Sequence, residues 1–242
     1  MKAIVLCGGL GTRLGELTRE TPKPLIPVAG RPFLSYVLDR LVEGGASELV
    51  LAVSFQWEKI RALYGSQWRG VPVAYSVEPQ PLGTGGAIRH AMRSHEIEEA
   101  IVVNGDTLLD LDAGALAAFA RDKAADVAMA LKYMADTSRF GRVEIDQAAR
   151  VLGFREKGVG QAGLINSGVY HVHARVFADS TDAAFSFELD VLAGKLDTAA
   201  IYGMQTDAYF IDMGVPEDLA RAQYELPLPR PRPAVAGEGP AR

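Results

Sequence analysis

The apolar positions in the first half of the chain alternate between two spacings. Short runs rich in branched aliphatic residues, which are typical of buried strands, occur at positions 4–6, 49–53, 71–75 and 101–103. The segments between these runs follow the period of a helix. The clearest of them carries an apolar stripe that one helical face would bury, followed by a glycine pair: Phe33, Leu34, Val37, Leu38, Leu41 and Val42, then Gly44 and Gly45. Strands that alternate with helices predict a parallel sheet.

From Asp126 onward the pattern becomes mostly strand-like. Alternating or continuous apolar runs occur at positions 127–131, 142–145, 151–154, 165–172 and 199–202, with fewer helices between them. We therefore expect the second half to be α+β and to extend the same sheet in a mixed orientation. Residues 1–226 are interpreted as one domain, and the Pro, Gly and Arg-rich segment 227–242 as a flexible tail.

The composition favours a folded protein with a small-molecule partner. The 242 residues are 48% hydrophobic and 23% charged, close to the average for globular proteins. A formal net charge of −5 without a basic cluster argues against nucleic acid and anionic membranes as partners. The single cysteine, Cys7, and an N-terminal apolar run too short for a signal peptide lead us to expect a cytoplasmic protein.

A glycine-rich segment follows the first predicted strand directly. It reads Gly8-Gly9-Leu10-Gly11-Thr12-Arg13-Leu14. Glycines let the backbone N–H groups approach phosphate oxygens closely, so the segment predicts an anion site. The dinucleotide fingerprint would need a third glycine at Leu14, and the P-loop would need Gly-Lys-Ser/Thr, which is absent. The alternative is a plain turn between a strand and a helix.

Together with Pro22-Lys23-Pro24, this segment resembles the signature of the sugar nucleotidyltransferase family. The resemblance implies a Rossmann-like three-layer α/β/α fold with a mixed, mainly parallel central sheet. It also implies that the loop wraps the nucleotide phosphates and that Arg13 and Lys23 are catalytic. Physical chemistry supports two fixed cations, because unit charges 4 Å apart repel by about 4 kcal/mol at an effective dielectric of 20. A helix N-terminus offsets only about 0.3–1 kcal/mol of such repulsion.

Two aspartates match the metal ligands of this family. Asp106 follows a buried-looking strand, and Asp212 lies in Phe210-Ile211-Asp212-Met213-Gly214. The resemblance implies that both bind Mg²⁺, which prefers carboxylate oxygens and bridges substrate phosphates. Taken singly, an aspartate after a strand is more often a helix cap or a turn residue, and that alternative stays open for Asp212.

The family resemblance also assigns the residues that contact the substrates. The expected nucleotide site is Leu6, Gly8, Gly9, Gly11, Thr12, Glu78, Gly83, Thr84 and Gly85. The expected sugar-phosphate site is Asn104, Gly141, Glu156, Lys157 and Asn166. A carboxylate at Glu78 could accept the N–H donors of guanine, although a buried turn without base contact is an equal alternative. Gly158 stands where many relatives have proline.

Within the family, the sequence looks most like the D-glycero-α-D-manno-heptose 1-phosphate guanylyltransferases. The resemblance rests on Phe33-Leu34, the turn at 81–88, Phe185-Ser186-Phe187-Glu188 and the segment 210–218. It implies GTP, or another nucleoside triphosphate, and a sugar 1-phosphate as partners, with GDP-heptose for bacterial surface polysaccharide as the product. Mannose-1-phosphate guanylyltransferases and N-acetylmuramate-1-phosphate uridylyltransferases share much of the pattern. The sequence allows a homo-oligomer without requiring one.

Other functional classes remain as alternatives. Asp110-Leu111-Asp112 is an Asp-x-Asp triplet that could hold the metal of a glycosyltransferase, although Asp112 also fits a helix cap before 113–120. A non-catalytic sensor of nucleotide sugars would not need Arg13, Lys23 and both aspartates. Ser186-Phe187-Glu188 is interpreted as the start of a helix and not as a site.

Overall fold

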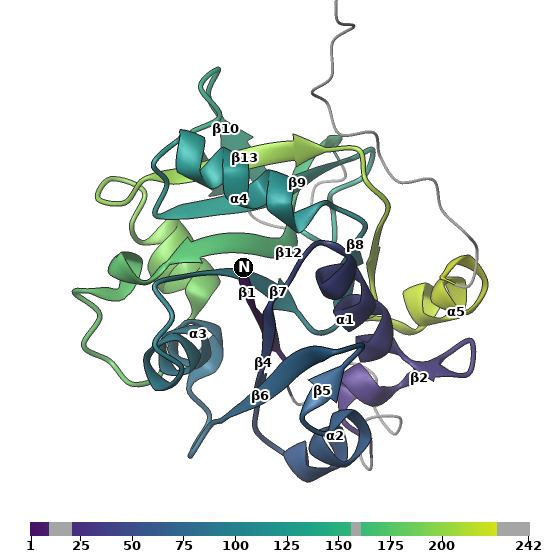
Figure 1. Cartoon of the computed structure of the whole chain (residues 1–242). Helices are drawn as coiled ribbons and strands as arrows, with labels where there is room; N and C mark the ends of the chain where they lie inside the picture. The colour runs from purple at the N-terminus through teal and green to yellow at the C-terminus, as the bar shows by residue number, and fades with distance from the viewer. Residues whose placement is uncertain (10–20, 156–160, 227–242) are drawn as a thin grey trace, which may run out of the picture.

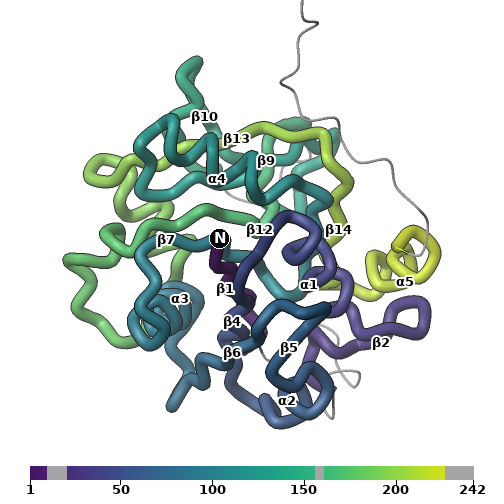
Figure 2. The backbone as a smooth tube through the Cα atoms, viewed as in Figure 1, coloured from purple at the N-terminus to yellow at the C-terminus, as the bar shows by residue number. Residues whose placement is uncertain are grey.

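The computed structural model describes residues 1–9, 21–155 and 161–226. The predicted tail therefore lies outside the described residues. The described strands form a ten-stranded sheet in the order β11-β10-β12-β7-β1-β4-β6-β5, with β9 pairing with β12 and β13. In Figure 2, β1 runs through the middle of the molecule beside β4. No helix among the described residues is long and apolar enough to span a bilayer.

The four predicted strands of the first half form the parallel part of the sheet. They are β1 (Lys2–Leu6), β4 (Glu48–Val53), β6 (Val71–Val77) and β7 (Glu99–Asn104). All their mutual pairings are parallel. Helices α1 (Phe33–Glu43), α2 (Trp57–Tyr64) and α3 (Gly83–Ser94) occur between them. The predicted helix of the apolar stripe is confirmed as α1, which ends at Gly44.

The second half extends the same sheet in mixed orientation, as predicted. Strand β12 (Gly163–His173) pairs antiparallel with β7 and with β9 (Val127–Met134). Strand β13 (Ile201–Thr206) lies parallel to β9. The hairpin of β10 (Arg142–Ile145) and β11 (Val151–Arg155) forms one edge, and β5 (Gln67–Trp68) the other. The predicted strand at 199–202 begins two residues later, at Ile201, and the Ala200 N–H before it donates to the Asp126 side chain at 2.7 Å.

Alternate residues of the central strands belong to two separate cores. On β1, Ala3 and Val5 pack with α1 and with α4 (Ala113–Asp122), whereas Ile4 packs with α3 on the opposite face. This alternation follows from the two-residue period of a strand. The second core also holds the short helix η3 (Ala174–Phe177) and the π-helix η4 (Phe187–Ala193). Helices cover both faces of the sheet (Figure 1), which confirms the three-layer α/β/α fold.

Shorter elements gather where the parallel strands end. They are η2 (Lys23–Leu25), β2 (Pro27–Val28), β3 (Arg31–Pro32), β8 (Thr107–Leu109), β14 (Phe210–Asp212) and α5 (Pro216–Glu225). Strand β14 pairs antiparallel with β8. Gln223 of α5 joins α5 to the β2–β3 hairpin, since its side chain accepts a hydrogen bond from Ala29 N–H and donates one to the Pro27 carbonyl. The end of the chain thus supports the segment that carries Lys23.

Candidate active site

The carboxyl ends of β1 and β7 bring the start of the glycine-rich loop beside Asp106. Leu6 pairs with Asn104, and Gly105 N–H donates to the Leu6 carbonyl at 2.9 Å. A Cβ atom on Gly105 would lie 2.7 Å from that carbonyl oxygen, so only glycine allows this approach. Ligands of open parallel α/β sheets bind at this edge. The predicted nucleotide residues Leu6, Gly8 and Gly9 lie here.

Lys23 and Asp106 form an ion pair across this edge. The Lys23 residue is only 6% exposed, and Pro22 and Pro24 restrict the backbone that carries it. The Asp106 side chain keeps 31% of its surface exposed, so the carboxylate also faces solvent. The pair places one fixed positive and one fixed negative group at the same strand end.

Asp212 lies next to Asp106 through an antiparallel ladder. In the β14–β8 pairing Asp212 stands opposite Thr107, and Met213 N–H donates to the Asp106 carbonyl at 2.9 Å. One Asp212 oxygen, Oδ1, accepts from Gly214 N–H at 2.7 Å. Among the described residues no group of three or more His, Cys, Asp or Glu side chains could hold a metal. Two aspartates whose backbones are joined by this ladder fit Mg²⁺ nevertheless, because it is usually bound by one or two carboxylates plus substrate phosphates and waters.

A cavity of about 580 Å³ opens beside the glycine-rich segment. Its described lining is Leu6, Gly8, Gly9, Ser54, Phe55, Glu78, Pro79, Gln80, Pro81, Gly83, Thr84 and Ala87. Glu78 Oε2 accepts from Leu82 N–H at 2.9 Å, and a Cβ on Gly8 would lie 2.5 Å from Glu78 Oε1. Burial raises the Glu78 pKa above its ordinary value. The volume is that of a small-molecule site.

The turn before α3 packs against the segment that leads into η4. Gly83 has φ +67°, and a Cβ there would lie 2.6 Å from the Phe185 carbonyl oxygen. Gly85 is buried, donates its N–H to the same carbonyl at 3.0 Å, and is not among the described residues that line the cavity. Thr84 does line the cavity, and its Oγ1 accepts from Phe187 N–H at 2.9 Å. These glycines are therefore required for packing against Phe185.

A second cavity, of about 560 Å³, lies on the side of the sheet extension. Its described lining is Phe140, Gly141, Arg142, Val143, Phe154, Arg155, Asn166, Glu188, Leu189 and Ala193. Gly141 has φ +72°, a left-handed conformation that favours glycine. Asn166 is joined to the strand edge through Gly168, whose N–H donates to Asn166 Oδ1 at 3.0 Å. A Cβ on Gly168 would lie 2.6 Å from Asn104 Nδ2, so Asn104 and Asn166 flank one glycine.

One known protein family matches nearly the whole described chain. The model of the family described as "Nucleotidyl transferase" matches residues 2–227. The chain belongs to this family. It is 40% identical to a D-glycero-α-D-manno-heptose 1-phosphate guanylyltransferase of Aneurinibacillus thermoaerophilus, covering 93% of this chain and 98% of the relative. It is 39% identical to one of Campylobacter jejuni, covering 90% and 96%.

A solved structure agrees with the fold. HddC from Yersinia pseudotuberculosis, in complex with GMP-PN, superposes with a TM-score of 0.83 at 34% identity, covering 93% of this chain and 99% of that one. The predicted family is thus confirmed, and the chain is a sugar-1-phosphate nucleotidyltransferase.

Several predicted site residues of this nucleotidyltransferase lie outside the described residues. Gly11, Thr12 and Arg13 belong to the undescribed segment 10–20, and Glu156 and Lys157 to the undescribed segment 156–160. The chain enters the first gap after Gly9, which lines the nucleotide-side cavity. It enters the second after Arg155, which lines the other cavity.

The Asp-x-Asp triplet is engaged in structural contacts in this nucleotidyltransferase. Asp110 is buried and pairs with Arg40 Nε at 3.2 Å. Asp112 is the N-cap of α4, and its Oδ1 accepts from Gly114 N–H at 2.8 Å. The Asp110 carboxylate is therefore engaged in a buried ion pair and the exposed Asp112 carboxylate in capping α4, which opposes the glycosyltransferase alternative and confirms the predicted helix cap.

The sequence analysis missed residues that line the two cavities. Among them are Phe55 on the nucleotide side and Arg142, Arg155, Glu188 and Leu189 on the other. Phe55 is 57% exposed directly after β4, and an exposed aromatic residue after a parallel strand was a signal that could have been used. The segment Ser186-Phe187-Glu188 does begin a helix, as predicted, because Ser186 Oγ accepts from Leu189 N–H. It contributes a cavity wall as well.

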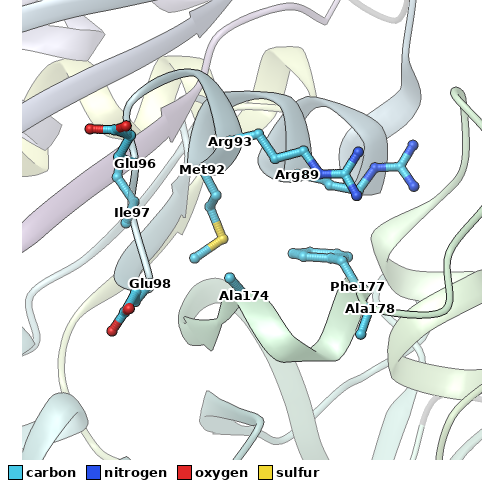
Figure 3. Close-up of a pocket in the computed structure, with 9 residues that line it drawn as sticks. All are labelled: Arg89, Met92, Arg93, Glu96, Ile97, Glu98, Ala174, Phe177 and Ala178. Atoms are coloured by element: carbon cyan, nitrogen blue, oxygen red, sulfur yellow. The ribbon is translucent and has the colours of Figure 1, made fainter.

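A third cavity, of about 370 Å³, contains none of the predicted site residues among its described lining. Figure 3 shows Met92 of α3 facing Ala174 and Phe177 of η3. Arg89 beside it donates to the carbonyls of Ser180 and Asp182. This cavity thus lies beside the Arg89 hydrogen bonds that hold the 180–186 segment against α3.

Proposed function

We propose that this nucleotidyltransferase transfers GMP from GTP to D-glycero-α-D-manno-heptose 1-phosphate, which gives GDP-heptose and pyrophosphate for a bacterial surface polysaccharide. The similarity to two heptose 1-phosphate guanylyltransferases supports the substrate pair. The observation that carries the proposal is the Lys23–Asp106 ion pair at the carboxyl ends of β1 and β7, the edge from which Leu6 lines the first cavity. Leu6, which lines the first cavity, pairs with Asn104. Asn104 in turn lies beside Gly168, in the turn that follows Asn166 of the second cavity.

The residues divide into three groups by what they would bind. The triphosphate lies along Gly8, Gly9, Gly11 and Thr12, where backbone N–H groups face its oxygens. Glu78 accepts the N–H donors of guanine with the lone pairs that Leu82 N–H leaves free. The sugar 1-phosphate lies along Asn104, Gly141, Glu156 and Lys157, with Asn166 in the wall of the second cavity.

The reaction is an in-line attack of a sugar-phosphate oxygen on the α-phosphorus of the triphosphate. Lys23 and Arg13 neutralise the phosphate charges that would otherwise keep the two substrates apart. Asp106 and Asp212 hold Mg²⁺, which when bound supplies charge stabilisation for the leaving pyrophosphate. Lys23 starts in contact with Asp106, so a bound phosphate competes with that carboxylate for its ammonium group. Positioning and charge neutralisation suffice, without a covalent enzyme intermediate.

Pyrophosphate release tests this proposal. The purified chain is assayed with Mg²⁺ against GTP, UTP, ATP, CTP and dTTP, each combined with heptose, mannose and N-acetylmuramate 1-phosphates. The highest kcat/KM is expected for GTP with D-glycero-α-D-manno-heptose 1-phosphate. A preference for mannose 1-phosphate or for UTP would overturn the substrate assignment and leave the reaction class standing.

A further inference from the structure

The cavity on the sheet extension has the walls that a sugar needs. Phe140, Phe154 and Leu189 supply apolar surface, which suits the C–H faces of a pyranose ring. Two of the polar side chains that line it come from elements far apart in the sequence. They are Asn166 on β12 and Glu188 on η4. Among the described residues, the side chains that can make hydrogen bonds to sugar hydroxyls here are therefore this pair and the strand arginines Arg142 and Arg155.

The hydrogen-bonding capacity of Asn166 is mostly used within the protein. Its Oδ1 accepts from Gly168 N–H at 3.0 Å. Its Nδ2 donates to Tyr170 Oη at 2.7 Å and to Glu188 Oε1 at 3.2 Å. A carboxamide has two N–H donors, so both are engaged. Asn166 is thus placed to orient its neighbours more than to bind a ligand.

Most of the hydrogen-bonding capacity of Glu188, in contrast, is left for a ligand. Glu188 is exposed to solvent at the cavity. The hydrogen bond from Asn166 uses one of about four acceptor positions of its carboxylate. Sugar hydroxyls are hydrogen-bond donors, and bonds to an ionised acceptor are the stronger ones. The carboxylate therefore matches the donor groups that a polyhydroxylated sugar presents.

The backbone that carries Glu188 is held from several directions. Phe187 is buried and packs edge-on against Tyr170, with ring centroids 5.1 Å apart. Its N–H donates to Thr84 Oγ1, and Asp190 Oδ2 accepts from Ser186 N–H at 2.7 Å. The segment forms a π-helix, a rare geometry that is frequent at functional sites. The carboxylate is therefore presented from a pre-organised position.

We propose that Glu188 is the residue that selects the sugar, by accepting hydrogen bonds from hydroxyl groups of the sugar 1-phosphate, and that Asn166 is its positioning residue. This inference rests on the proposed function, since it needs a sugar 1-phosphate in this cavity. It assigns a role to a residue that the sequence analysis identified as part of a helix start and of the family resemblance, and not as a site.

Steady-state kinetics of Glu188→Gln test the inference. The substrate is the sugar 1-phosphate with the highest kcat/KM in the panel above, expected to be D-glycero-α-D-manno-heptose 1-phosphate, with its monodeoxy analogues. Replacing the charged acceptor is expected to lower kcat/KM for the sugar roughly 10- to 100-fold, because a hydrogen bond to a charged group is lost. The KM for the triphosphate should stay at the wild-type value. The variant should also lose the discrimination that the wild type shows against one deoxy analogue.

Controls separate a binding role from damage to the fold. Glu98→Gln changes an exposed glutamate at the cavity of Figure 3 and should keep wild-type kinetics. Asn166→Ala should raise the sugar KM in the wild-type background and add little to Glu188→Gln, because both act through one carboxylate. Thermal unfolding of each variant verifies folding.

The outcomes distinguish this inference from the proposed function. An active wild type with unchanged sugar kinetics and unchanged deoxy discrimination in Glu188→Gln would overturn the role of Glu188 alone. Additive effects of Asn166→Ala and Glu188→Gln would overturn the positioning role of Asn166. A wild type that releases no pyrophosphate with any pair in the panel would overturn both.

Discussion

Lys23 and Asp106 form an ion pair between a short 3-10 turn and the end of a parallel strand. The two residues are 83 positions apart in the sequence, and the lysine is almost fully buried. An ammonium group in this position is oriented before any substrate arrives, which lowers the entropic and reorganisation cost of holding phosphate charge. The four predictions below concern this pair and the groups around it.

Lys23→Met should lower turnover by roughly 100- to 1,000-fold, the usual effect of removing one fixed donor from a charge-stabilising site. The stopped-time pyrophosphate assay measures it. Lys123→Met, at the end of α4, removes the same charge away from the edge and should keep normal turnover. Comparable rates in Lys23→Met and Lys123→Met would contradict a catalytic role for Lys23.

Asp106→Asn should raise the Mg²⁺ concentration for half-maximal activity by at least about tenfold, because the amide is a weaker ligand for a hard cation than a carboxylate. The measurement is a Mg²⁺ titration of the rate at fixed substrate concentrations. Asp112→Asn provides the matched control, since Asp112 caps α4. A shifted Mg²⁺ requirement in Asp112→Asn, with none in Asp106→Asn, would revive the glycosyltransferase alternative.

Gly168→Ala should destabilise the protein by about 1–3 kcal/mol, because a non-glycine residue is strained in the left-handed region. Gly168 has φ +75°, and the added Cβ would approach Asn104 Nδ2 to 2.6 Å. Urea unfolding measures the change. Gly153→Ala on β11 introduces a methyl group with nothing within 4 Å and should be close to neutral. Equal stability of both variants would show that the strand edge relaxes around the new side chain.

Glu78 should make stability fall as pH rises, because burial raises its pKa in the folded state. Between the unfolded and the folded pKa the native state binds more protons than the unfolded state, so raising the pH through this window favours unfolding. The free energy of unfolding of the wild type, relative to Glu78→Gln, should therefore decrease as the pH rises above the ordinary glutamate pKa of about 4.3. Urea titrations at several pH values measure this difference. A difference that stays constant would mean that Glu78 titrates normally.

The regular elements around the site were predictable because their signals are local. The strand ending at Asn104 and the helix beginning at Phe33 are each encoded by the spacing of apolar residues within one segment. The order of strands and helices predicted the parallel sheet for the same reason, whereas the three layers were implied by the family resemblance. The π-helix geometry at 187–193 could not be predicted, since it depends on how Phe187 packs against Tyr170 and Thr84.

The turn at 81–86 shows where local interpretation stopped. The family resemblance assigned its residues to the nucleotide site, and the structure shows in addition a close approach of the backbone at Gly83 and Gly85. The partner of that approach is the Phe185 segment, about a hundred residues later in the chain, and no pattern within the turn could name it. Glycine removes a steric barrier without specifying what fills the space.

The sequence by itself determined the fold class, the place of the glycine-rich segment after the first strand, and the family, because hydrophobic period, glycine placement and the Pro-Lys-Pro segment are written in contiguous residues. Only the tertiary structure decided that Asp212 stands beside Asp106 and that Glu188 shares a cavity with Asn166. Those neighbours are set by strand pairing and core packing over long separations, where each contact depends on the whole sheet and not on the residues next to it.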